Sequence, residues 1–242
     1  MQDQRPIIVW FRRDFRLSDH RALSAACRQK VPIIPVFIHD ETVEALGAAP
    51  KWRIGLAVEK FAESLKGLGS KLVLRRGAAV AEILKLAEET NAQAVYWSRA
   101  YLPDQVKRDT DVKAALQARG LTGQSFTGHL LLEPWKVSTK TGGYYRVFTP
   151  MWKAVRNTEL PATEPTVTQL ITPEVWPESA ELADWGMARA MDRGAAVVRS
   201  YAAVGEDAAH SQLERFLSEA VDNYTKTRTF RRFMELHACR RT

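Results

Sequence analysis

IIVWFRRDFRLSDHRAL, residues 7–23, changes from an apolar run to alternating arginine and aspartate and then to the start of a helical pattern. Its first five residues are β-branched or aromatic and show no polar alternation, which is typical of a strand buried on both faces of a parallel sheet. Ser18 and Asp19 then offer N-cap side chains for a helix that begins before Ala22. The stretch therefore predicts a buried strand followed by a helix.

Three arginines follow this strand: Arg12, Arg13 and Arg16. They lie at its carboxyl end, where open α/β sheets bind their ligands. A structural clasp is the alternative, because a buried charge without a partner is costly and Asp14 and Asp19 are close enough in sequence to pair with the arginines. The sequence leaves both a ligand site and a clasp open, and favours the clasp for most of the arginines.

Strand-like and helical patterns alternate over the first half of the chain. This alternation is typical of βαβ units with right-handed crossovers. We expect an α/β fold, a Rossmann-like three-layer domain with a five-stranded parallel sheet, over residues 5–132. The expected strands are Ile7 to Phe11, Ile33 to Ile38, Leu72 to Leu74, Ala94 to Trp97 and Gln124 to Phe126.

The helices between these strands have apolar stripes at helical spacing. Most of the tryptophans are expected in the core, including Trp10, Trp97 and Trp135. The inward positions are Trp52, Leu56, Phe61 and Leu65 in a helix from Pro50 to Gly67, Ile83, Leu84 and Ala87 in a helix from Ala78 to Glu89, and Val106, Val112 and Leu116 in a helix after Pro103.

Beyond residue 132 the character of the sequence changes. Residues 133–204 form an irregular extension and a linker rich in proline, and residues 205–228 form a helix with one apolar side. Residues 229–242 are a basic tail. Residues 226–242 carry six basic residues and one acidic residue, so the rest of the chain is close to neutral despite a net charge of +7. We expect at most weak, non-specific and salt-dependent nucleic-acid binding from this tail.

Several function classes find no support in the sequence. The turn after the first strand has no G-x-G-x-x-G pattern, and no Walker loop is present. His20, His39 and His129 have no second ligand at metal spacing, and no catalytic or metal constellation emerges. Without a membrane-spanning run or a signal peptide, the chain is predicted to be a cytoplasmic protein with a ligand cleft, and a monomer.

Six segments, in order, resemble successive segments of the DNA photolyase and cryptochrome family. They are VWFRRDFRLSDHRAL at 9–23, PVFIHD at 35–40, LVLRRG at 72–77, VYWSRAY at 95–101, LLLEPWKVSTKTGGYYRVFTPMWK at 130–153 and AVGEDAAHSQLERFLSEAVDNYTKTR at 203–228. The resemblance implies an α/β domain that carries an antenna chromophore of folate (pterin) or deazaflavin type. It also implies a linker to an all-helical domain that binds FAD and a damaged pyrimidine pair flipped out of DNA. In the family the excited flavin supplies the electron, so the protein needs no catalytic side chain of its own.

Site residues follow from the resemblance position by position. Tyr224 matches a tyrosine that contacts FAD, and Arg228 matches a basic position near the flavin and the DNA. The antenna site is expected around residues 12–15, 37–40 and 101–105. Family members often have an acidic residue before the proline of the last of these segments, whereas this chain has Leu102, so Asp104 and Gln105 are the candidate antenna contacts.

The chain departs from the family after Arg228. A stretch similar to TSxLSPYL and many helices are expected there, but the sequence is TFRRFMELHACRRT. The resemblance thus indicates an N-terminal photolyase portion with only the first helices of an otherwise missing helical domain, arising from an altered reading frame, inactive alone and purifying without FAD. The alternatives are a stand-alone antenna- or nucleotide-binding module, a cryptochrome-like light sensor, and a non-functional product with an uncovered helix.

Overall fold

The computed structural model describes residues 5–139 and 141–227. Contacts within the chain divide it into two compact units, residues 1–200 and residues 201–242. The first contains the α/β fold, and the second is described by itself. The finer domain boundaries expected from the sequence stay predictions.

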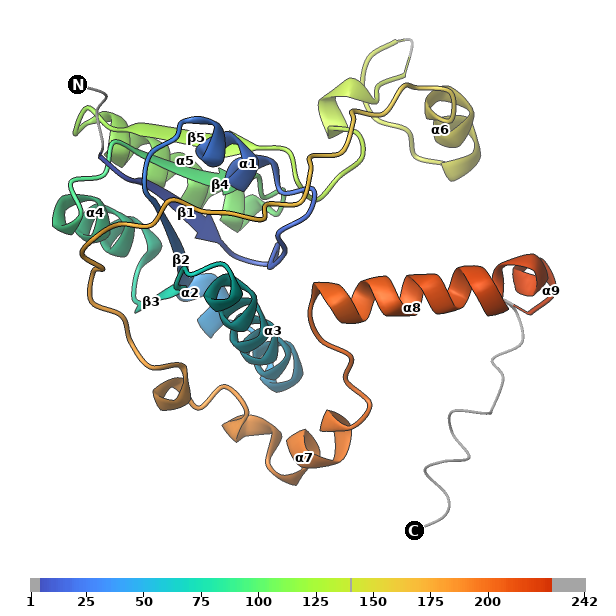
Figure 1. Cartoon of the computed structure of the whole chain (residues 1–242). Coiled ribbons are helices and arrows are strands. Elements are labelled where there is room, and N and C mark those ends of the chain that lie inside the picture. The colour runs from blue at the N-terminus through green and yellow to red at the C-terminus, as the bar shows by residue number, and fades with distance from the viewer. Residues whose placement is uncertain (1–4, 140, 228–242) are drawn as a thin grey trace. The chain divides into compact units, whose positions relative to one another are not determined.

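Five parallel strands form one sheet in the order β3-β2-β1-β4-β5 (Figure 1). Strand β1 lies in the centre, and Trp10 stands opposite Val36 of β2 and Trp97 of β4. The α/β fold expected from the alternating pattern is confirmed. The strands are β1 (Ile7–Phe11), β2 (Ile33–His39), β3 (Val73–Arg76), β4 (Ala94–Ser98) and β5 (Thr122–Phe126).

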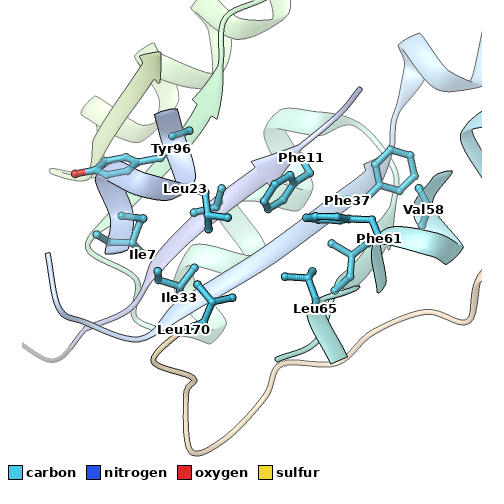
Figure 2. Close-up of a cluster of buried hydrophobic side chains, with 14 of the residues drawn as sticks. Ile7, Phe11, Leu23, Ile33, Phe37, Val58, Phe61, Leu65, Tyr96 and Leu170 are labelled. Atoms are coloured by element: carbon cyan, nitrogen blue, oxygen red, sulfur yellow. The ribbon is translucent and has the colours of Figure 1, made fainter. Parts of the chain in front are cut away.

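Helices cover both faces of the sheet. One core cluster joins alternate residues of β1 to α1 and α3, and Figure 2 shows its centre around Phe11, Phe37 and Phe61. The other joins the remaining residues of β1, including Trp10, to α4 and α5. The helices of this domain are α1 (Arg21–Arg28), α2 (Glu41–Glu44), α3 (Ala48–Gly67), α4 (Ala79–Glu89) and α5 (Pro103–Gln117).

Three side chains differ from the sequence prediction. His20, rather than Ser18 or Asp19, caps α1, and its Nδ1 accepts a hydrogen bond from the Leu23 amide at 3.1 Å. Val106 is 45% exposed, because it lies six residues before the buried Val112 and therefore about 120° away from it around the helix. Trp135 is 62% exposed and follows the last strand, beyond the helices that cover the sheet.

The proline-rich linker packs against the sheet domain. Residues 162–180, here called the strap, have no helix or strand but bond to the domain along their length. The Ile33 amide donates to Ile171 O at 2.9 Å, and the Ala180 amide donates to Leu74 O at 2.9 Å. Leu170 is buried in the core of Figure 2. The strap therefore completes one face of the domain and covers the edge strand β3.

The strap leads into three short helical segments, and the chain around Met187, between the first two of them, packs on α3. Met187 is buried against Gly55, where an added Cβ would lie 2.9 Å from the Met187 Cβ. This close approach gives Gly55 a packing role. The segments are η2 (Leu182–Trp185), η3 (Arg189–Met191) and α7 (Arg193–Arg199).

The remaining helices are short or exposed. Between β5 and the strap lie η1 (Pro134–Lys136) and α6 (Phe148–Val155). The second unit contains α8 (Glu206–Glu219), η4 (Val221–Asn223) and α9 (Tyr224–Thr227). No helix in the described ranges is long and apolar enough to cross a membrane.

Candidate ligand-binding site

A cavity of about 300 Å³ opens at the carboxyl ends of β1, β2 and β4. This is the edge at which a parallel sheet binds ligands, and the volume is at the lower end for small-molecule sites. One wall is apolar, and the remainder is rich in arginine. The lining residues are Arg12, Arg13, Phe37, Ile38, Asp40, Thr42, Val43, Leu46, Ile54, Ala100, Tyr101, Leu102, Gln105, Arg108 and His129.

The floor of the cavity is fixed by a buried ion network of two arginines and two aspartates. Arg12 Nη1 lies 2.7 Å from Asp109 Oδ1, and Arg108 Nη1 lies 2.6 Å from Asp40 Oδ2. Arg108 also donates to Asp109 Oδ1, with its Nη2 at 3.0 Å. Burial lowers the pKa of Arg12, and the nearby Asp109 carboxylate opposes that shift. The four charges balance one another, so their burial leaves no net charge.

Two tryptophans anchor this network to the sheet. The guanidinium carbons of Arg12 and Arg108 lie 4.8 and 4.7 Å from the centre of the Trp10 ring, which is within cation–π distance. Trp97 Nε1 donates to Asp109 Oδ2 at 3.0 Å. Asp40 also caps α2 by accepting hydrogen bonds from the Thr42 and Val43 amides. The network is thus a rigid clasp between strand ends and two helices.

The three arginines after β1 have different environments. Arg12 takes part in the clasp, but its acidic partner is Asp109 rather than Asp14 or Asp19. Arg16 donates to the backbone oxygens of Ser18, Asp19 and Gly128, and is 4.0 Å from the Asp19 carboxylate. The Arg13 side chain is exposed at the cavity, and within the described residues no hydrogen bond or ion pair holds its guanidinium group. Arg13 is therefore available to a ligand.

Asp14 lies beneath the cavity and pairs with His20. His20 Nε2 is 2.8 Å from Asp14 Oδ2, an ionic contact whose angle departs from that of a hydrogen bond. His20 Nδ1 accepts from the Leu23 amide, so the ring proton is on Nε2 and faces Asp14. Burial alone would raise the pKa of Asp14, but the facing His20 ring, Ser98 and the Arg12 amide together hold it well below its usual range.

The other two histidines considered from the sequence lie near this end of the sheet. His129 lines the cavity, and burial lowers its pKa. His39 is buried beside Glu44 and the Trp185 ring, and burial lowers its pKa as well. Across residues 5–139 and 141–227, no group of three or more histidine, cysteine or acidic side chains could hold a metal ion.

The structure separates the candidate site residues. Gln105 lines the cavity, whereas Asp104 is exposed and is not among the lining residues. Tyr224 lies in the second unit, is 50% exposed and contacts the Phe216 ring at 5.5 Å. Arg228 lies outside the described residues. Both antenna candidates and both flavin candidates stay predictions.

Sequence reasoning missed Arg108 and Asp109, which hold the cavity floor from α5. Their signal was present in the helical phase. Arg108 precedes the buried Val112 by four residues and so lies on the same inward face of the helix. Two charged residues at that face required buried partners.

Comparison with known proteins connects this geometry to a family. The DNA photolyase family model matches residues 7–169. A deoxyribodipyrimidine photo-lyase of Agrobacterium fabrum is 38% identical over 226 residues, which cover 93% of this chain and 47% of that protein. A deoxyribodipyrimidine photo-lyase of Synechococcus is 30% identical over 93% of this chain and 48% of that protein. Cryptochrome-2 of Arabidopsis thaliana is 36% identical over 63% of this chain.

A solved structure agrees with these relatives. The crystal structure of a bacterial class III photolyase from Agrobacterium tumefaciens superposes with a TM-score of 0.85 and 36% identity. It covers 93% of this chain and 47% of that chain. The chain therefore spans about half the length of the relatives that match nearly all of it.

Proposed function

The chain belongs to the DNA photolyase family, and we propose that it supplies the N-terminal α/β part of a light-dependent DNA-repair photolyase. The observation that carries this proposal is the match to the Agrobacterium photolyase, in sequence and in fold, over 93% of the chain. The cryptochrome match covers only 63% of the chain, which favours repair over a sensor role. The substrate of the complete protein would be DNA with ultraviolet-induced pyrimidine dimers.

We further propose that the cavity at the strand ends binds the antenna chromophore. Its apolar lining, with Phe37 and Ile54, suits a flat ring system, and Gln105 adds a polar group to the lining. Arg13 adds an exposed positive charge for an acidic group of the ligand. The clasp of Arg12 and Arg108 keeps these walls in place without a bound ligand.

The flavin candidate Tyr224 is not among the residues that line this cavity. Tyr224 is half exposed, and one aromatic contact contributes about 1–3 kcal/mol, which corresponds to a dissociation constant in the millimolar range or weaker. We therefore assign FAD, which would supply the excited-state electron transfer, to the region that the relatives carry beyond the matched half. The isolated chain is expected to purify without FAD and to show no repair.

A titration tests the antenna assignment. The purified chain is mixed separately with a reduced folate, a deazaflavin, FMN and FAD, and binding is followed by fluorescence. We expect one of these to bind in the micromolar range, and Leu46→Trp, which fills the half-buried rim of the cavity, to weaken binding at least tenfold. Val175→Ser, at an exposed position of the strap, is the matched control. If the native chain and the Leu46→Trp variant bind the ligand equally well, the ligand does not bind in this cavity.

A chimaera tests the repair assignment. Residues 1–227 replace the matched half of the Agrobacterium photolyase, and loss of pyrimidine dimers from irradiated DNA is measured under blue light and in the dark. We expect repair in the light only. A chimaera that folds and retains FAD but repairs nothing would favour the sensor alternative.

A further inference from the structure

A second cavity, of about 350 Å³, shares part of its lining with the cavity at the strand ends. Ala100 and Tyr101 line both. Beyond them, the first cavity, here called the strand-end cavity, continues to Gln105 and Arg108 of α5. The second, here called the η1 cavity, continues to Trp135 of η1. Residues 100–101 therefore form a wall between two spaces of similar volume.

The Tyr101 side chain of this wall is held by a buried carboxylate. Both carboxylate oxygens of Glu133 lie 3.0 Å from the Tyr101 hydroxyl, and Glu133 is 6% exposed. Burial and the Glu133 carboxylate raise the pKa of Tyr101, so the phenol stays protonated and donates to Glu133. Residues 99–102 lie between β4 and α5, outside any helix or strand. Glu133 thus supplies the contact that orients this ring.

Glu133 also holds the other side of the wall through Arg99. Arg99 Nη1 lies 2.5 Å from Glu133 Oε1, and Arg99 Nη2 donates to Ser125 O at 3.3 Å. The guanidinium carbon of Arg99 lies 5.1 Å from the centre of the Trp135 ring. The ion pair compensates the cost of burying the Glu133 carboxylate. One side chain therefore connects Tyr101 to the residues that line the η1 cavity.

This contact has two interpretations. A purely structural tie would join η1 to the end of β4, and its loss would lower stability without changing ligand preference. The shared wall supports a second role, because displacement of the Tyr101 ring would join the two cavities into one of about twice the volume. We propose that Glu133 is a positioning residue that keeps Tyr101 between the two cavities and thereby limits the size of the ligand that the strand-end cavity accepts.

The proposal specifies the ligand class. It rests on the proposed ligand-binding role of the strand-end cavity, whereas the positioning of Tyr101 does not require that role. A volume of about 300 Å³ is at the lower end for small-molecule sites. The closed wall therefore favours a flat ring system with a short acidic chain over a dinucleotide. FMN and FAD carry the same flavin ring and differ in the adenosine phosphate of FAD, so their relative affinity measures the size limit.

The first test compares these two flavins on the full chain by fluorescence titration. The native chain is expected to bind FMN at least tenfold more tightly than FAD. Glu133→Met retains most of the side-chain volume but neither accepts from Tyr101 nor pairs with Arg99, so it should narrow this preference to less than threefold. Glu133→Gln retains an acceptor for the Tyr101 hydroxyl and should restore most of the preference. Glu159→Met, at an exposed acidic position of the linker, is the matched control and should change nothing.

The second test needs no ligand. Tyrosines are nitrated with tetranitromethane, and the modified positions are followed by mass spectrometry. Tyr144 and Tyr201, which are 73% and 62% exposed, serve as internal references. Relative to them, Tyr101 is expected to react at least threefold faster in Glu133→Met than in the native chain, because its hydroxyl is released and ionises more readily. The Glu159→Met control should react at the native rate.

Several outcomes would overturn the proposal. An unchanged preference for FMN in a folded Glu133→Met chain would leave Glu133 as a structural tie, and equal nitration of Tyr101 would show that Glu133 does not hold the ring. If Glu133→Met does not fold, Tyr101→Phe, which removes only the hydroxyl, must narrow the preference to the same extent. A native chain without a preference for FMN would overturn the size limit even if it binds a folate. If the native chain binds no ligand at all, the proposed function is contradicted, and the nitration rates decide the positioning of Tyr101.

Discussion

Side chains at the carboxyl edge of the sheet have partners within this domain, whereas the aromatic side chains of α6 are exposed. At the edge, Arg108, Asp40 and Asp109 are buried, Arg12 is largely covered, and each meets an opposite charge within the same domain. On α6, Phe148 and Trp152 are exposed and meet little beyond each other. The first region pairs its charges within this domain, whereas the second leaves its apolar side chains exposed. Substitutions should therefore lower the stability of this chain in the first region and change it little in the second.

The largest effect is expected at Arg108. Arg108→Ala leaves the Asp40 carboxylate buried without its cation and removes one partner of Asp109, so we expect a loss of about 3–5 kcal/mol in the free energy of unfolding. Urea denaturation measures it. The neighbouring Lys107→Ala is the control, because its ion pair with Asp111 is exposed and should be worth less than about 1 kcal/mol. Similar values for both variants would mean that the clasp does not stabilise the fold.

The strap gives the next largest effect. Leu170→Ala removes a side chain that is 8% exposed in the core of Figure 2, and a loss of about 2–4 kcal/mol is expected. Val175→Ala, on the exposed part of the strap, should change stability by less than about 0.5 kcal/mol. Both are measured by thermal and urea unfolding. If Leu170→Ala costs as little as Val175→Ala, the strap does not contribute to the core.

Asp14 gives a smaller effect that depends on pH. Its pKa in the folded chain lies below the reference value of 3.8, so below about pH 4 the unfolded chain takes up a proton that the native chain does not. The stability that the Asp14–His20 pair contributes is present above about pH 4 and is lost as the pH falls below that value. Asp14→Asn should cost about 2 kcal/mol at pH 7 and flatten the acid limb of the stability curve. An unchanged acid limb would contradict the pairing with His20.

The smallest effect on this chain is expected at Trp152. Trp152→Ser should change its free energy of unfolding by less than about 0.5 kcal/mol, because the side chain is half exposed and belongs to no core cluster. Urea denaturation measures the change. A large loss of stability in the 242-residue chain would show that α6 packs on this domain.

The strands were predictable because burial on both faces leaves a strong local signal. Residues 7–11 and 33–38 are continuous apolar runs, and the structure confirms both strands. The strap was not predictable, since its prolines exclude regular elements but say nothing about contact with β2 and β3. The cap by His20 was not predictable either. Asp19 accepts a hydrogen bond from the Glu164 amide of the strap and has a φ of 44°, so it does not cap α1.

The candidate site on α5 was predictable only as a segment. Gln105 lines the cavity and Asp104 does not, although both lie within about 60° of Arg108 around the helix. The resemblance gave residues 101–105, but a family pattern that departs at Leu102 does not say which of them faces the cavity. The pairing of Arg12 with Asp109 joins residues 97 positions apart, which no local pattern reveals.

The strap also sets the order in which the protein can fold during synthesis. All five strands have been made once residue 126 is added, but Leu170 and the carbonyl that accepts from Ile33 come about 45 residues later. At about 5–20 residues per second, the sheet waits several seconds with one apolar face incompletely covered. We therefore expect the nascent chain to be most prone to aggregation during that interval.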